Sequence, residues 1–495
     1  MSQMHPDDNP LKAEKRRKLH ELKKLGMDPF PHTFLRTHKV EQVVTEHSGL
    51  QTGEVKESAE VSMAGRLMTV RAMGKASFFN FQDQSGSLQA YIRLEEMSEE
   101  DRKFFDLVDI GDIIGIKGFV FKTKKGELSV HCKSFRILCK TLEPLPEKYH
   151  GIADVELKYR SRHLDLIMNQ ESRKVFEARS LIIREIRRFL DARGFLEVET
   201  PVLQPLYGGA AAHPFTTHHR ALDMKLYLKV SPELYLKRLI VGGFEKVYEV
   251  SKNFRNEGID RSHNPEFTML EWYEAYTDYE YQMKQFEDII AHVCKTLHGT
   301  TKIQYQGKEL DFTTPWRRIS VYDSIKEYGG FDVSTMSAEQ LYKKIKELGA
   351  DLDKPASHGQ MVMEAFDLVV EKNLWNPTFV IDFPVEISPL TKKHRSKKGL
   401  VERFEPVCTG MEIGNAYTEL NDPEDQRARL EEQEKQRATN EEAYPMDEDF
   451  VSAIEVGMPP TGGVGIGIDR MVILLTDQPS LRDVLFYPTM KPHKG

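Results

Sequence analysis

The chain has 495 residues, enough for about three domains with cores of their own, and its 40% hydrophobic and 29% charged residues are typical of an ordinary soluble protein. The net charge of −8 gives no global sign of a nucleic-acid partner, so such a partner has to be met by local patches. No apolar run is long enough to span a membrane, and no signal peptide opens the chain. Cys132, Cys139, Cys294 and Cys408 form no Cys-x-x-Cys pair and no zinc spacing, which favours free thiols in the cytoplasm.

Residues 1–57 are expected to form a basic helix followed by a polar lead-in. Good helix formers run up to Gly26, ahead of Pro29, and carry a cluster of basic side chains: Lys12, Lys15, Arg16, Arg17, Lys18, Lys23 and Lys24. The cluster is compatible with a solvated helix face and with a helix laid against nucleic-acid phosphates. The sequence leaves both interpretations open.

Residues 58–145 alternate with the period of two that is typical of strands. Five short segments with this alternation are separated by glycines: 61–68, 76–82, 88–92, 112–118 and 128–132. So many strands in so short a stretch predict a small closed barrel of the OB type. Phe78, Phe79 and Phe81 stand beside Arg66 and Arg71, a combination suited to stacking on splayed bases, although one of these phenylalanines must face the core.

Residues 146–170 are charged and are expected to link the barrel to a second domain, residues 171–495. Apolar residues recur at helical spacing from Ser172, the expected N-cap, to Gly194, and a strand follows as far as Pro201. Residues 284–375 contain amphipathic fragments such as 338–348, which predict a small helical insertion without a recognisable chemical constellation.

Two alternating runs between residues 247 and 273 flank a loop marked by Gly258 and Pro265, which predicts an antiparallel hairpin with a long tip. One face of this hairpin would gather polar and aromatic side chains: Arg255, Glu257, His263, Phe267, Glu271 and Tyr273. A solvated strand face is one explanation. Because Leu270 and Trp272 flank the charges, a sheet with a buried face and a charged cleft fits better, and the cleft suits a nucleotide.

Residues 403–420 repeat this chemistry on a second predicted strand. Glu405 and Glu412 flank Gly410, while Asn415, Tyr417 and Glu419 share one strand face. That face could be exposed to solvent, or it could form the floor of the cleft. Two carboxylates near a triphosphate are suitable ligands for Mg²⁺, a hard ion that takes carboxylate and phosphate oxygens.

A glycine run at residues 459–475 resembles a phosphate loop only superficially. It has no Gly-Lys-Ser/Thr and no acidic residue at the distance that a dinucleotide fold requires. The alternating glycines instead predict a closely packed strand, followed by a helix with Arg470 in its first turn. A guanidinium beside a helix N-terminus favours an anion.

Three stretches in this order resemble the motifs of class II aminoacyl-tRNA synthetases: about 172–201 (motif 1), 247–273 (motif 2, with Phe-Arg-Asn-Glu and His-Asn-Pro-Glu-Phe) and 459–475 (motif 3). The surrounding sequence is similar to the lysine-specific members of subclass IIb over nearly the whole chain. The resemblance implies a multidomain α+β protein, with an N-terminal OB-fold barrel that binds an anticodon and a catalytic domain built on an antiparallel sheet flanked by helices. It also implies a homodimer that uses ATP and Mg²⁺ to join lysine to tRNA(Lys) through a lysyl-adenylate.

The resemblance further assigns roles to single residues. It makes Arg255 the catalytic residue, at the α-phosphate and the substrate carboxylate. It places ATP on Arg255, Glu257, His263, Asn264, Phe267 and Arg470, and magnesium on Glu405 and Glu412. It places the substrate lysine on Gly209, Glu233, Arg255, Glu271, Tyr273, Asn415, Tyr417 and Glu419, and the anticodon on Phe78, Gln89 and Glu127.

Three rival interpretations are open. Aspartate and asparagine synthetases resemble the chain at Ser231-Pro-Glu233, but they carry Gln in place of this glutamate and a substrate-binding Lys where Leu236 stands. A lysine ligase that modifies a protein would lack the barrel. A tRNA-binding paralogue with an inactive catalytic domain is the third, and the presence of Arg255 and Arg470 argues against it.

Overall fold

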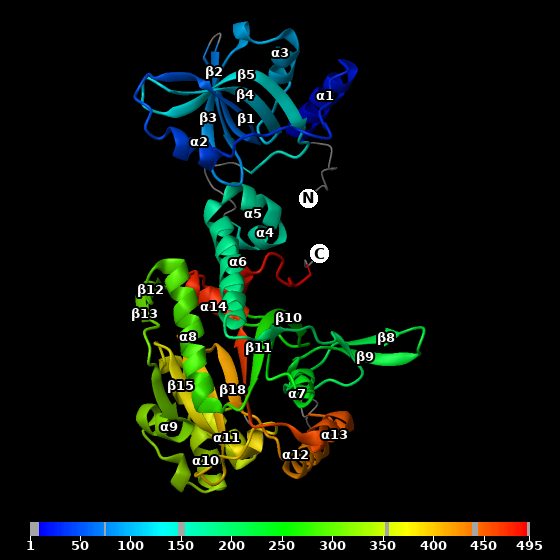
Figure 1. Cartoon of the computed structure of the whole chain (residues 1–495), viewed down its shortest axis with the longest axis vertical. Helices are drawn as coiled ribbons and strands as arrows, with labels where there is room; N and C mark the ends of the chain where they lie inside the picture. The colour runs from blue at the N-terminus through cyan, green and yellow to red at the C-terminus, as the bar shows by residue number, and fades with distance from the viewer. Residues whose placement is uncertain (1–8, 74–75, 147–153, 352–355, 438–443, 493–495) are drawn as a thin grey trace. The chain divides into compact units, whose positions relative to one another are not determined.

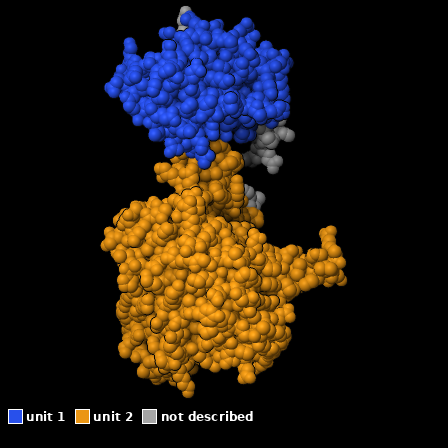
Figure 2. Space-filling view, in the orientation of Figure 1, with its two compact units in different colours: residues 1–151 blue, residues 152–495 orange. Residues whose placement is uncertain are grey.

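The computed structural model describes residues 9–73, 76–146, 154–351, 356–437 and 444–492. The chain divides into two compact units, 1–151 and 152–495 (Figure 2). Among the described residues, no helix combines the length and the apolar character needed to cross a membrane.

The first unit is the predicted closed barrel. Its strands are β1 (Val55–Met73), β2 (Ala76–Gln82), β3 (Ser87–Arg93), β4 (Ile113–Lys122) and β5 (Leu128–Cys139), joined in the order β1-β2-β3-β5-β4. Phe79 and Phe81 fill the interior, whereas Phe78 alternates to the outside and is half-buried. Helices α1 (Pro10–Lys24), α2 (Val40–His47) and α3 (Glu99–Asp106) and the short 3-10 helix η1 (Leu94–Glu96) complete the unit.

Part of the basic cluster on α1 is neutralised within this unit. Lys15 is buried and its Nζ donates to the carbonyl of Ile110 at 3.0 Å, while Lys18 lies 2.7 Å from Asp109. Arg17 is held between two glutamates of its own helix, Glu14 and Glu21. The contacts of Lys15 and Lys18 attach α1 to the rest of the unit, so these two cations are engaged within the protein.

The second unit is built on a nine-stranded sheet in the order β14-β15-β16-β18-β19-β11-β10-β6, with β17 paired to β16 (Figure 1). All neighbours are antiparallel except β14 with β15 and β10 with β6. The strands are β6 (Leu196–Glu197), β10 (Lys246–Phe254), β11 (Glu266–Ala275), β14 (Arg317–Ser320), β15 (Thr378–Pro384), β16 (Leu400–Cys408), β17 (Met411–Glu412), β18 (Gly414–Thr418) and β19 (Thr461–Gly467). The predicted barrel followed by an antiparallel sheet is thus confirmed.

One face of this sheet is covered by α6 (Gln170–Asp191), α8 (Tyr279–His298) and α14 (Ile468–Leu475) (Figure 1). Trp272 and Leu270 point into the core beneath them, together with Phe286 of α8. Because successive side chains alternate along a strand, Glu271 and Tyr273 must face the other way. The hairpin therefore has the buried face and the polar face that its pattern predicted.

Three local expectations need correction. The region expected to be a linker contains α4 (Val155–Arg160) and α5 (Arg162–Met168), and Arg162 is buried against the carbonyls of Arg482 and Leu485. Helix α6 is capped by Asn169, because the Ser172 hydroxyl donates instead to Asp165 at 3.0 Å. The strand expected at 195–201 is reduced to the two residues of β6.

Residues 284–375 do not form a purely helical insertion. Most of α8 lies in the core of the unit, and β14 joins the main sheet. The region also contains the hairpin of β12 (Lys302–Tyr305) and β13 (Lys308–Asp311). Only α9 (Val321–Gly329), η2 (Val333–Thr335), α10 (Ala338–Glu347), α11 (His358–Val369) and η3 (Glu371–Asn373) match the expectation, around an apolar cluster of their own.

The other elements surround the open face of the sheet. They are the small sheet of β7 (Leu203–Gln204), β8 (Thr216–His219) and β9 (Met224–Leu228), then α7 (Glu233–Val241), η4 (Val385–Ile387), α12 (Pro423–Gln436) and α13 (Glu448–Gly457). Helix α15 (Leu481–Val484) packs instead against α14 and α6, on the covered side. Helix α7 packs against β10, β11 and α13 and so brings its first turn to the polar face of the hairpin.

Candidate active site

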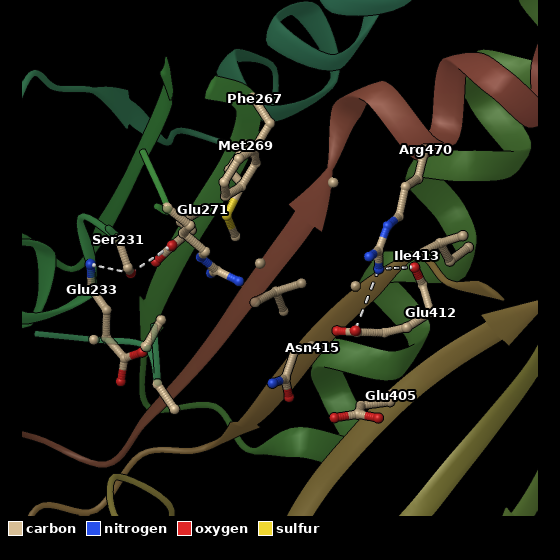
Figure 3. Close-up of a pocket in the computed structure, with 18 of the residues that line it drawn as sticks. Ser231, Glu233, Phe267, Met269, Glu271, Glu405, Glu412, Ile413, Asn415 and Arg470 are labelled. Carbon is tan, nitrogen blue, oxygen red and sulfur yellow. Dashed lines mark hydrogen bonds and ion pairs between the residues drawn. The ribbon is translucent and has the colours of Figure 1, made fainter. Parts of the chain in front are cut away.

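A cavity of about 410 Å³ opens on the polar face of the sheet. Strands β11, β18 and β19 form its floor, while α7 and the loop between β10 and β11 form its sides. The size is that of a small-molecule site. Figure 3 shows Glu233 and Glu271 on one side of it and Glu405, Glu412 and Arg470 on the other.

Arg255, just after β10, lines this cavity, and no carboxylate of the described residues forms an ion pair with it. Its guanidinium carbon lies 5.1 Å from the ring centroid of Phe267. Its Nε is buried, and no hydrogen-bond partner for it exists among the described residues. A buried guanidinium donor left unsatisfied is costly, so this arrangement points to an anionic ligand.

Arg470 lies at another part of the cavity wall, in the first turn of α14 as predicted. Its Nη1 donates to the main-chain carbonyl of Glu412 at 2.6 Å and lies 3.4 Å from the Glu412 carboxylate (Figure 3). Its Nη2 lies 3.2 Å from Nε2 of His263. The structure thus brings together three residues that the sequence placed near ATP or its metal.

Glu405 and Glu412 both line the cavity, and their chemistry fits a divalent cation. Burial raises the pKa of Glu405 to about 7, the nearby charge of Glu412 raises it as well, and Arg403, whose Nη2 lies 2.5 Å from Glu405, opposes them. A buried carboxylate facing a second carboxylate is stabilised by a bound cation. This donor set is the one that Mg²⁺ takes beside phosphates.

Glu271 lies at the opposite end of the cavity from Glu405, with both carboxylate oxygens held (Figure 3). Ser231 Oγ donates to one oxygen at 2.8 Å, and Tyr273 Oη donates to the other at 3.1 Å. Burial, and then the charge of Glu233, raise the pKa of Glu271 to about 8. Glu233 is in turn held by the Tyr417 hydroxyl at 2.9 Å.

Glu419, which the resemblance placed at the substrate lysine, has a partner that the sequence did not show. It is fully buried behind the cavity wall, and one of its oxygens is ion-paired with Lys237 of α7. Its Oε1 has no hydrogen-bond partner among the described residues. The strand pattern placed Glu419 on the right face, but it could not show which helix packs behind that face.

Gly463 of β19 leaves space for the carboxylate of Glu419. A Cβ on Gly463 would lie 2.0 Å from Glu419 Oε1 and 2.4 Å from Cε1 of Tyr273. Such contacts are far inside van der Waals distance, so no side chain fits here. The glycine run is therefore explained by close packing, as the sequence indicated, and at Gly463 the close neighbour is a charged side chain.

Gly463→Ala is expected to lower the free energy of unfolding by about 1–3 kcal/mol or more, because the methyl group displaces Glu419 and Tyr273. Gly467→Ala on the same strand is the matched control, since its Cβ would meet only the Arg470 side chain, at 3.6 Å or beyond. Denaturant titration of both variants measures the difference. Equal losses of unfolding free energy in the two variants would show that a side chain is tolerated no worse at Gly463 than at Gly467.

The remaining predicted residues take varied positions. Gly209 has a positive φ of 84°, and a Cβ there would lie 2.9 Å from Ser231 Oγ, so both conformation and space require glycine. Asn415 accepts from Arg403 Nε at 3.0 Å, which leaves its amide nitrogen as the group that can donate. Asn264 joins its loop to the C-terminal segment through Thr489, and Glu257 lines the cavity from an exposed position.

Sequence reasoning missed four residues around the cavity: Ser231, Lys237, Arg403 and Tyr444. One signal was available for Lys237, which follows Glu233 by four positions, the spacing of a helical ion pair. No local signal marks Arg403 or Tyr444, because long-range packing decides their positions.

In the barrel, the three residues predicted to read an anticodon lie together on its outer surface. Gln89 Nε2 donates to the Glu127 carboxylate at 2.9 Å, and Ser129 Oγ donates to Gln89 Oε1 at 3.0 Å. Phe78 packs on Tyr91 of the adjacent strand with 4.9 Å between ring centroids. The result is an aromatic surface beside a fixed amide, which suits single-stranded bases.

Comparisons with known proteins agree with this geometry. Residues 154–491 match the family model of tRNA synthetases class II (D, K and N), and residues 61–138 match that of the OB-fold nucleic acid binding domain. Lysine–tRNA ligase of Pelotomaculum thermopropionicum is 52% identical over 99% of this chain and 96% of its own length. The corresponding proteins of Carboxydothermus hydrogenoformans (51%, covering 99% of both chains) and Syntrophomonas wolfei (49%, covering 100% of both) are similar. The chain therefore belongs to the class II tRNA synthetases of the aspartate, lysine and asparagine group, and within that group to the lysine–tRNA ligases.

Proposed function

We propose that this enzyme joins L-lysine to tRNA(Lys) in two steps. First, a carboxylate oxygen of lysine attacks the α-phosphorus of ATP, which forms lysyl-adenylate and expels pyrophosphate. Second, a terminal ribose hydroxyl of the tRNA takes the lysyl group and AMP leaves. No general base is needed for the first step, so the residues act by positioning and by stabilising charge.

The observation that carries the choice of lysine is the charge at one end of the cavity. Glu233, Glu271 and Glu419 gather there with little or no exposure to solvent. A substrate with two ammonium groups is suited to such a site, whereas an acidic substrate is repelled by it. We assign the α-ammonium to Glu233, Glu271 and Gly209, and the ε-ammonium to Glu419 and Tyr273.

The other end of the cavity suits ATP. Arg255 would stabilise the charge that develops on the α-phosphate and the substrate carboxylate, with Asn415 as a further donor. Arg470 and His263 would hold the terminal phosphates, while Glu257, Asn264 and Phe267 would hold the nucleoside and the bend of the triphosphate. Glu405 and Glu412 would hold magnesium, which neutralises phosphate charge when bound.

An aspartate or asparagine substrate is not favoured. Leu236, where those relatives carry a substrate-binding lysine, is fully buried in an apolar cluster with Val247 and Ile240. No cation can act on a substrate carboxylate from that position. An inactive paralogue is disfavoured by the unsatisfied Arg255, since a site without a ligand has no reason to keep it.

Exchange of pyrophosphate into ATP, run with each amino acid in turn, tests the proposal directly. Lysine should support exchange far better than aspartate or asparagine, and transfer should require tRNA(Lys). Exchange with aspartate and not with lysine would refute the substrate. No exchange with any amino acid, from protein that is folded and binds ATP, would support the inactive paralogue.

Phe78→Ala or Gln89→Ala should reduce tRNA charging at least about tenfold, because a stacked base contributes roughly 1–3 kcal/mol. Pyrophosphate exchange without tRNA should stay intact, since these residues belong to the barrel. Phe30→Ala serves as a comparison, because Phe30 is an exposed phenylalanine of the same unit outside the ring contacts of Phe78 and Tyr91. A parallel loss of both activities would make Phe78 and Gln89 structural.

We also propose a homodimer formed through the motif 1 segment. Strand β6 is an edge of the main sheet, and Leu196, Val202 and Leu203 expose apolar side chains on and near it. Edge strands with exposed apolar residues need a cover. Sedimentation equilibrium should give twice the chain mass of 57.1 kDa, and Leu196→Glu should lower it. A monomeric parent would refute the dimer.

Because the reaction serves translation, we propose that the enzyme is located in the cytoplasm.

A further inference from the structure

Lys237 is a fully buried cation at the back of the proposed lysine pocket. Its Nζ lies 2.6 Å from Oε1 of Glu233 and is also ion-paired with Oε2 of Glu419. It joins α7 to the segment after β18, and so connects two of the three carboxylates assigned to substrate ammonium groups. It does not itself line the cavity.

The surroundings of Lys237 hold it in place and keep it charged. Its ammonium lies 5.7 Å from the ring centroid of Tyr417 and 5.9 Å from that of Phe450, on two other elements. Burial acts to lower the pKa of Lys237, but the charges of Glu233 and Glu419 outweigh it and raise that pKa above its usual value. The two carboxylates therefore favour the charged form of Lys237.

Charge balance gives this cation a function. Glu233, Glu271 and Glu419 are nearly or fully buried, while the neighbouring Glu249 is already paired with Lys229 at 2.6 Å. The substrate lysine brings two ammonium groups, and its carboxylate is left to Arg255. Lys237 supplies the third ammonium, so the occupied pocket contains equal numbers of buried carboxylates and ammonium groups.

We propose that Lys237 is a positioning residue for substrate recognition, which neutralises one buried carboxylate and fixes Glu419 so that its free oxygen meets the substrate's ε-ammonium. The free oxygen is Oε1, which has no hydrogen-bond partner among the described residues. It lies beside Gly463 and Tyr273, both of which line the cavity. This inference rests on the proposed function and deepens it.

Lys237→Met keeps an unbranched chain of similar length and removes the charge. We expect KM for lysine to rise on the order of 10², because two carboxylates lose a buried partner, while KM for ATP stays unchanged.

The pH dependence gives a second measurement. The groups facing Glu419 are Lys237 and Glu233 on α7, Glu271 and Tyr273 on β11, and Tyr417 on β18. With its cation removed, Glu419 should ionise only at higher pH, so the acid limb of kcat/KM for lysine should move upward.

Lys140→Met is the matched control, because Lys140 is also fully buried and paired with two carboxylates, Asp109 and Asp112, but in the barrel. It should lower Tm without changing KM for lysine in pyrophosphate exchange.

If Lys237→Met does not fold, Lys237→Gln removes the charge and keeps a hydrogen-bond donor. The double variant Lys237→Met with Glu233→Gln removes one charge of each sign, and its loss should be smaller than the product of the two single losses.

These measurements distinguish the role of Lys237 from the activity of the enzyme. If the parent fails to activate lysine, the proposed function fails. If the parent activates lysine and folded Lys237→Met keeps its KM and pH profile, the role of Lys237 is refuted. Equal losses for lysine and ATP, or a double variant whose loss is the full product, would make Lys237 structural only.

Discussion

Replacing Arg255 with alanine is expected to lower lysine-dependent pyrophosphate exchange by on the order of 10² to 10³. The guanidinium lines the cavity, stacks on Phe267 and has a buried Nε with no partner in the described part of the chain. Its loss removes the cation that faces charge developing on the α-phosphate. The drop should appear in kcat as well as in kcat/KM, since this interaction strengthens as the charge develops.

Arg255→Lys should recover little of the lost exchange, because an ammonium is a point charge and lacks the planar fork of a guanidinium. Arg317→Ala is a suitable control, since Arg317 lies in the same unit and forms a half-exposed ion pair with Glu327. That variant should retain parental exchange. Near-normal exchange by Arg255→Ala would show that motif 2 has been misread.

Glu419→Gln is expected to cause the largest loss that is specific to the amino acid. The amide keeps the shape of the carboxylate but leaves the substrate's ε-ammonium without a counter-ion in a buried site. Breaking a buried pair in this way costs about 3–5 kcal/mol, so kcat/KM for lysine should fall by on the order of 10² to 10³. Because Glu233 still pairs with Lys237, the helix should stay in place and the affinity for ATP should change little.

Glu287→Gln provides the control for burial, because Glu287 is a buried glutamate of α8 that accepts the main-chain N–H of Trp316 at 2.8 Å, away from the cavity. It should leave the KM for lysine unchanged. Activation of lysine by Glu419→Gln at the parental rate would mean that another group reads the ε-ammonium. In that case Glu271 would be the next candidate, since burial raises its pKa to about 8 and a cation would lower it.

Local patterns predicted most of the framework. The period of two with glycines between strands gave the closed barrel, and the alternation around Trp272 gave the buried and polar faces of the hairpin. The barrel strands and the two faces of the hairpin could be predicted because each depends only on one segment and on the segment next to it in the sequence. The predictions failed where two local solutions compete: Asn169 and Ser172 can both cap α6, and contact with Asp165 decides between them.

The sequence by itself determined which side chains share a strand face, and so which groups could form a site. Asn415, Tyr417 and Glu419 were placed together on this basis, as were Glu271 and Tyr273. The tertiary structure decided what lies behind each face, because that depends on contacts between segments far apart in the chain. Lys237 and Glu419 are separated by 182 positions, and only the packing of α7 on the polar face of the sheet makes Glu419 one half of a buried ion pair.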